Sequence, residues 1–185
     1  MTLRLLLLLA ILALNGFFAA AEVALVSVRR SKLDALAKKG NVGARAALEL
    51  LANPERLLSV TQVGVTLASL GLGWAGEETL YELFLGWLGA ITPLQSNVLH
   101  GASFTLGFLS MSFCHVIVGE VVPKNLAIDK ADRLALLAAP ALLFFHRLSS
   151  PFVFVVERTT AVVSRLLGIR GHGAGGHSAE ELKFI

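Results

Sequence analysis

Charged side chains are scarce in this chain of 185 residues, where Asp, Glu, Lys and Arg make up 16% and hydrophobic residues 55%. The longest stretch without a charged residue covers residues 83–119. Mean hydropathy is +0.72, and a soluble domain of this length cannot bury so much apolar surface. We therefore predict an all-α integral membrane protein in contact with lipid.

Patterns that specific functions require are also missing. The one cysteine, Cys114, excludes an internal disulfide and a metal site built from several cysteines. The net charge is only +3 and the basic residues show no aromatic interleaving, so we expect no nucleic-acid partner. The sequence contains no Ser-His-Asp arrangement, zinc-protease motif or phosphate-binding loop. We therefore expect a protein that is not an enzyme.

Three apolar runs are long enough to cross a membrane, at about residues 5–28, 57–76 and 94–118. The first also resembles a signal peptide, but it continues past its alanines and ends on Arg29 and Arg30, as a stop-transfer segment does. We predict that it stays in the protein. Basic residues are far more numerous after this span than before it, which predicts a multi-pass protein of the plasma or inner membrane with the N-terminus outside and the C-terminus cytoplasmic.

Shorter segments connect and follow these spans. Residues 31–53 are predicted to form two cytoplasmic helices, with Ser31 capping the first, Gly40 ending it, and Asn53 capping the helix of the second span. The acidic residues that follow the second span have no basic neighbours, which favours an outside loop. These are Glu77, Glu78 and Glu82.

The last third of the chain contains only short apolar segments. Residues 125–148 are broken by Pro140 and are predicted to form a re-entrant helical hairpin, followed by a juxtamembrane helix at about 151–167. Residues 171–185 combine a glycine-rich linker with the start of another helix. We expect residues 1–170 to be the membrane domain and a cytoplasmic regulatory region to begin after them.

The strongest functional signal is Gly-Glu-Val-Val-Pro-Lys at residues 119–124, which closes the longest uncharged stretch. A carboxylate at the deep end of an apolar run is costly in lipid and usually has a function. Gly119 and Pro123 predict backbone that departs from a regular helix, and its carbonyl groups can then bind a cation. We predict a cation site built from Glu120 and the carbonyls around it.

Polar residues in the first two spans supply further oxygen atoms, a donor set that suits Mg²⁺, Ca²⁺ or Na⁺ better than zinc or copper. Two simpler interpretations stay open: the small residues of the second span serve helix packing, and Glu120 forms a structural ion pair with Lys124 or Arg29. The polar and small residues concerned are Asn15, Glu22 and Ser27 in the first span and Thr61, Gln62, Gly64, Thr66 and Ser69 in the second.

Three stretches resemble the transmembrane domain of the CNNM/CorC family of magnesium transporters. They cover residues 15–27 (NGFFAAAEVALVS), 58–69 (LSVTQVGVTLAS) and 119–124 (GEVVPK). The pairing of Glu-x-x-Pro-Lys after a long apolar span with Ala-Glu-x-Ala-x-x-Ser in the first span is specific, and the likeness extends over nearly the whole chain. The segment SAEELK at 178–183 resembles the family's lead-in to a cytoplasmic pair of CBS domains, which binds ATP and regulates transport.

The resemblance implies a homodimer in which each protomer transports Mg²⁺, coupled to Na⁺, with ATP bound only by a regulatory domain outside these residues. At the positions of this chain that match the family's motifs, the implied Mg²⁺ ligands are Ser27, Ser69, the Gly119 carbonyl and Glu120. Family members often carry Asn at positions 65 and 69, where this chain has a valine without a side-chain oxygen and Ser69. Supporting or gating roles fall to Asn15, Glu22, Thr61, Gln62, Gly64, Thr66, Pro123 and Lys124. The alternative function is a Mg²⁺-sensing membrane anchor that transports nothing and signals through its soluble region.

Overall fold

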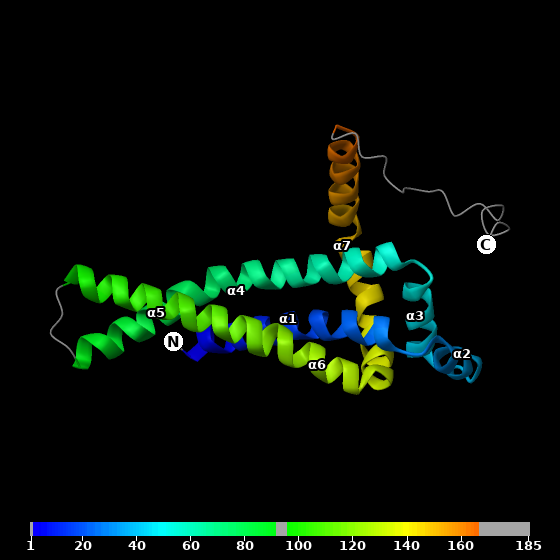
Figure 1. The fold of residues 1–185 in the computed structure, drawn as a ribbon, viewed down its shortest axis with the longest axis horizontal. Coiled ribbons are helices and arrows are strands. Elements are labelled where there is room, and N and C mark those ends of the chain that lie inside the picture. Colours follow the sequence, from blue (N-terminus) through cyan, green and yellow to red (C-terminus); the bar gives the residue numbers. More distant parts are fainter. Residues whose placement is uncertain (1, 92–95, 167–185) are drawn as a thin grey trace, which may run out of the picture. The chain divides into compact units, whose positions relative to one another are not determined.

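The computed structural model describes residues 2–91 and 96–166, and every regular element in these two ranges is a helix (Figure 1). Four helical stretches within them are long and apolar enough to cross a membrane. The predicted all-α membrane class is therefore confirmed. The elements are α1 Thr2–Ser27, α2 Arg30–Lys38, α3 Val42–Leu51, α4 Pro54–Ile91, α5 Ser96–Val116, the π-helix η1 Ile117–Val121, α6 Val122–Asp129 and α7 Ala131–Leu166.

The contacts divide the chain into residues 1–147 and 148–185. In the first unit, α4 returns along α1, and α5 packs on α4 (Figure 1). The π-helix and α6 also lie against α1. In the second unit, the described part of α7 carries exposed apolar side chains, among them Phe152 and Phe154. All of the predicted site residues belong to the first unit.

Small residues allow the helices of the first unit to approach closely, as the composition of the second span predicted. Ala19 and Ala24 of α1 are fully buried. A Cβ atom added at Gly64 of α4 would lie 2.4 Å from Cδ1 of Phe18, and one at Gly43 of α3 would lie 2.2 Å from the Leu136 carbonyl oxygen. Neither position has room for a larger side chain.

Local sequence signals explain the short helices. Gly40 has φ 87, a conformation that favours glycine, and it follows α2. The Asn53 side-chain oxygen accepts a hydrogen bond from Arg56 N at 3.0 Å at the start of α4, as predicted. The predicted cap at Ser31 is wrong, because Arg29 has extended backbone and α2 begins at Arg30, which leaves Ser31 inside the first turn.

The expected loop after the second span is also wrong. Helix α4 continues through Glu77 and Glu82 to Ile91. Arg4 near the start of α1 pairs with this extension, since its Nη1 lies 3.1 Å from Glu82 Oε2 and 3.6 Å from Glu78 Oε1. Thr92 and Pro93, predicted to restart the helix, lie outside the described residues, as do residues 168–185.

Two helices occupy the region of the predicted re-entrant hairpin. Residues 125–148 contain the end of α6, Lys130, and the first part of α7. Helix α7 continues through Pro140 and Pro151, so the predicted juxtamembrane helix at 151–167 is the later part of the same helix as far as Leu166. A proline inside a helix removes one backbone hydrogen bond, which packed membrane helices can tolerate.

Candidate cation site

The irregular backbone predicted around Gly119 is the π-helical turn η1. Val122 N donates to the Ile117 carbonyl, five residues back, in place of the four-residue spacing of an α-helix. Pro123 has no N–H with which to donate to the Gly119 carbonyl in an α-helical pattern. Turns of this kind occur frequently at functional sites, because they change the direction of nearby carbonyls and side chains.

Four residues from α1, α4, α5 and η1 form a hydrogen-bonded group, which we call the polar cluster: Asn15, Ser69, His115 and Gly119. Asn15 is fully buried, and its Nδ2 donates to the Gly119 carbonyl at 2.9 Å. Ser69 Oγ donates to Asn15 Oδ1 at 3.3 Å and lies 3.1 Å from His115 Nε2. Because the serine hydroxyl has one hydrogen, this assignment makes His115 Nε2 the donor to Ser69. The polar cluster thus connects three long helices through one buried amide.

Two glycines allow this contact between α1 and η1. A Cβ at Gly16 would lie 3.0 Å from Pro123 Cγ. A Cβ at Gly119 would lie 3.0 Å from Leu12 Cδ1 and 3.1 Å from Asn15 Nδ2. The absence of side chains brings the Gly119 carbonyl within reach of the Asn15 amide.

A cavity of about 190 Å³ lies beside the polar cluster. Ser69, Ser112 and His115 supply polar groups to its wall, and Glu77 supplies a carboxylate. This volume is large enough for several waters. Glu77 also lines a second hollow of about 440 Å³ with Glu78. The two hollows therefore share an acidic side chain.

Glu77 is a candidate site residue that the sequence analysis missed. The sequence analysis predicted a loop at Glu77 and therefore did not assign this residue to the helix of the second span. On the continuous helix α4, Glu77 follows Ser69 by eight residues, so the two lie about 12 Å apart along the axis and on similar faces. This eight-residue spacing would have indicated Glu77 as a site residue if the helix of the second span had been predicted to continue past residue 76.

Glu120 forms an ion pair in this structure. Its Oε1 lies 2.6 Å from Lys124 Nζ, one helical turn further along the chain. This is the contact that the simpler interpretation of the motif predicted. The side chains of Glu120 and Lys124 are 38% and 37% exposed, so the carboxylate lies at the surface of the chain.

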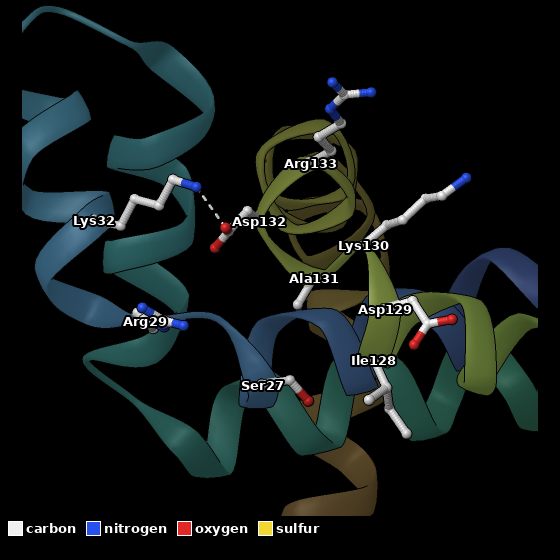
Figure 2. A pocket seen from close by; sticks show the side chains of 9 residues that line it. All are labelled: Ser27, Arg29, Lys32, Ile128, Asp129, Lys130, Ala131, Asp132 and Arg133. Atoms are coloured by element: carbon white, nitrogen blue, oxygen red, sulfur yellow. Dashed lines mark hydrogen bonds and ion pairs between the residues drawn. The ribbon is translucent and has the colours of Figure 1, made fainter.

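The structure brings together some of the predicted ligands and separates others. Ser69 and the Gly119 carbonyl are joined through Asn15. Ser27 is exposed near the end of α1, twelve residues and about 18 Å along the helix from Asn15. It lines a different cavity, beside Arg29 and Lys32 (Figure 2). In the described ranges, no group of three or more His, Cys, Asp or Glu side chains has the arrangement of a metal site.

The remaining predicted residues differ in their surroundings. Thr61 is fully buried and donates to the Leu57 carbonyl of its own helix at 3.0 Å, and Gly64 packs against Phe18. These two residues have the packing role that the simpler interpretation gave them. Gln62 and Thr66 are exposed, and Glu22 is half-buried and forms no ion pair within the described ranges.

The fold and the polar cluster define a multi-pass, all-helical membrane domain. The family model described as "Cyclin M transmembrane N-terminal domain" matches residues 5–185, and the chain belongs to this CNNM family. The resemblance found in the sequence is thereby confirmed.

Curated relatives agree with this assignment. UPF0053 protein YrkA of Bacillus subtilis is 34% identical over 186 residues, which cover 100% of this chain and 43% of the relative. UPF0053 protein YhdT of the same organism is 37% identical over 95% of this chain and 38% of its own length. UPF0053 inner membrane protein YfjD of Escherichia coli is 25% identical over 93% of this chain and 37% of its own length. The chain thus spans less than half the length of each of these relatives.

Proposed function

We propose that this domain transports Mg²⁺ across the membrane and that the ion passes the polar cluster. The observation that carries the proposal is the buried hydrogen-bonded group that joins α1, α4, α5 and η1 near the middle of α1. Polar groups in the membrane interior are costly and commonly mark ion pathways. The alternative, a helix-packing role alone, does not explain the adjoining cavity or the carboxylate of Glu77 in its wall.

The donors around the polar cluster suit a hard cation. Asn15 Oδ1, Ser69 Oγ and the Gly119 carbonyl are neutral oxygens, and the neighbouring Glu120 adds one carboxylate. Mg²⁺ prefers oxygen ligands and keeps several of its waters. A cavity with the volume of several waters accommodates a partly hydrated ion, which neutral ligands hold weakly enough to release.

We propose that Lys124 and the transported ion alternate as partners of Glu120. In the present conformation Lys124 neutralises the carboxylate at 2.6 Å. An arriving cation would replace the ammonium group, so the carboxylate would not stay unpaired within the membrane. Ser27, a ligand by resemblance, lies about 18 Å along α1 from Asn15, so it would contact the ion at a different point along the pathway.

Three further features belong to the proposal. Transport is coupled to Na⁺, two copies of the chain form a homodimer, and the protein lies in the cell membrane with its C-terminus in the cytoplasm. Support comes from the family resemblance, from the printed description of YfjD as an inner membrane protein, and from the basic residues after α1.

The test is Mg²⁺ flux into liposomes that contain the purified chain and an internal Mg²⁺-sensitive dye, with and without a Na⁺ gradient. Glu120→Ala is expected to reduce flux to the level of empty liposomes while the helix content stays unchanged. The matched control is Asp34→Asn, which removes a carboxylate from an exposed position on α2 and should transport normally.

Two results would contradict the proposal. Unchanged flux in Glu120→Ala would remove the carboxylate from the pathway. Saturable Mg²⁺ binding to the unmodified chain without any flux would instead favour the Mg²⁺-sensing anchor. A flux that is equal with and without the Na⁺ gradient would contradict the coupling alone.

A further inference from the structure

A cavity of about 500 Å³ lies at the end of α1, away from the polar cluster (Figure 2). Its wall is built from the junction of α1 with α2 and from the turn between α6 and α7. Four cationic and two anionic side chains line it, so its net charge is +2. These are Arg29, Lys32, Lys130, Arg133, Asp129 and Asp132.

One ion pair connects the two walls, and three cations and the Asp129 carboxylate remain outside it. Lys32 Nζ lies 2.5 Å from Asp132 Oδ2, which joins α2 to the start of α7. In the part of the chain that the structure describes, Arg29, Lys130 and Arg133 form no ion pair. Figure 2 shows Lys130 extending from the turn between α6 and α7 and Arg133 from the first turn of α7, both pointing away from Arg29, which lies at the other wall. The pocket therefore offers unneutralised positive charge from two separate segments.

The ends of two membrane-length apolar stretches lie beside this pocket, a position that corresponds to the depth of lipid phosphates when these stretches cross a membrane. The apolar helix α1 ends at Ser27, and the last membrane-length apolar stretch begins at Ala131. Both residues line the pocket, as does the apolar side chain of Ile128. A phosphate at this depth would meet the cations, while acyl chains continue along the exposed apolar surface of the helices.

We propose that this pocket binds the phosphate of an anionic phospholipid headgroup. Arginine and lysine both bind phosphate through charge-assisted hydrogen bonds, and arginine can donate two in parallel. Basic pockets between membrane helices are suited to such headgroups. A soluble phosphate offers the same chemistry, but the depth of the pocket at the helix ends favours the lipid. The bound headgroup would hold the turn between α6 and α7 against the start of α2.

Native mass spectrometry of the delipidated chain in detergent tests this inference, with phosphatidylglycerol and phosphatidylcholine titrated separately. The unmodified chain is expected to bind phosphatidylglycerol more tightly than phosphatidylcholine. The double variant Lys130→Gln/Arg133→Gln should lose affinity for phosphatidylglycerol by about fivefold for each cation, or about 30-fold in total. Both side chains are exposed, so the helix content should not change.

The matched control is Lys38→Gln/Lys39→Gln, which removes two exposed cations that do not line the pocket. It should bind phosphatidylglycerol as the unmodified chain does. An equal loss in the control, or equal affinity for the two lipids, would overturn the proposal. Titration of inorganic phosphate into lipid-free micelles distinguishes binding of a lipid phosphate from binding of a soluble phosphate. If it stabilises the unmodified chain but not the pocket variant, and phosphatidylglycerol has no advantage, the pocket takes a soluble phosphate and the lipid assignment is wrong.

Discussion

At the scale of single residues, Asn15 has a role in the polar cluster that few side chains can fill. Its amide donates to the Gly119 carbonyl with one end and accepts from Ser69 with the other. An aspartate of the same shape would offer no N–H to the carbonyl, and a leucine would offer neither group. The residue therefore sets both the packing of α1 against η1 and the orientation of the oxygens around the cavity.

Replacing Asn15 by alanine should leave the buried Gly119 carbonyl and the Ser69 hydroxyl without this partner. We expect a loss of about 1–2 kcal/mol in the free energy of unfolding, because hydrogen bonds between membrane helices contribute modestly. Denaturation of the chain in detergent micelles measures it. The control Thr105→Ala removes an exposed hydroxyl that bonds within its own helix at 2.9 Å, and should cost less than about 0.5 kcal/mol. Equal losses in the two variants would show that the interhelical bonds of Asn15 do not stabilise the fold.

At the scale of the elements, local chemistry predicted some boundaries well. Gly40 and Asn53 mark helix ends through their own backbone and side chain, so a few neighbouring residues contain the whole signal. Gly119 and Pro123 likewise predicted the irregular turn that the structure has as η1. The extension of α4 was not predictable in this way, because Glu82 is paired with Arg4, which lies 78 residues earlier in the chain.

In the candidate site, too, the local features were predictable from the sequence and the contacts between distant segments were not. The sequence named Asn15, Ser69 and Gly119 as polar or irregular positions in three spans. Which of them meet depends on the relative register of α1, α4 and η1, and that register follows from contacts such as Gly16 with Pro123. Ser27 illustrates the limit: it belongs to the same motif as Asn15, yet twelve residues of helix separate them by about 18 Å.

The contact between α1 and α4 provides a test of close packing. Gly64→Ala would place a methyl group 2.4 Å from the Phe18 ring and force the helices or the ring to move. We expect a loss of about 1–3 kcal/mol in unfolding free energy, typical of an overpacked core. The control Gly86→Ala lies on the same helix with nothing within 4 Å of the added atom. It should be neutral or stabilise by up to about 1 kcal/mol, since alanine favours the helix. A neutral Gly64→Ala would mean that the two helices can separate at low cost.

At the scale of the whole molecule, the charges of the spans are distributed unevenly. Glu77 and Glu78 lie toward one end of α4, beside two hollows. Basic residues gather at the C-terminal end of α1, where they line the pocket that we assign to a lipid phosphate. Under our proposals, Glu77 would attract cations toward the polar cluster, and the basic groups would anchor the opposite end at the membrane surface. The uneven distribution of charge is therefore consistent with both the proposed cation pathway and the proposed lipid site.

The same distribution predicts the orientation of the protein in the membrane. Arg29, Arg30 and Lys32 follow the first span while Arg4 alone precedes it, so Thr2 should lie outside the cell and Lys39 inside. In a Cys114→Ser background, Thr2→Cys should react with a membrane-impermeant maleimide on intact cells. Lys39→Cys should react only after the membrane is permeabilised. Both positions are exposed, so burial within the protein does not protect either of them. Labelling of Lys39→Cys on intact cells, with Thr2→Cys protected, would reverse the assignment and place the basic pocket at the outer surface.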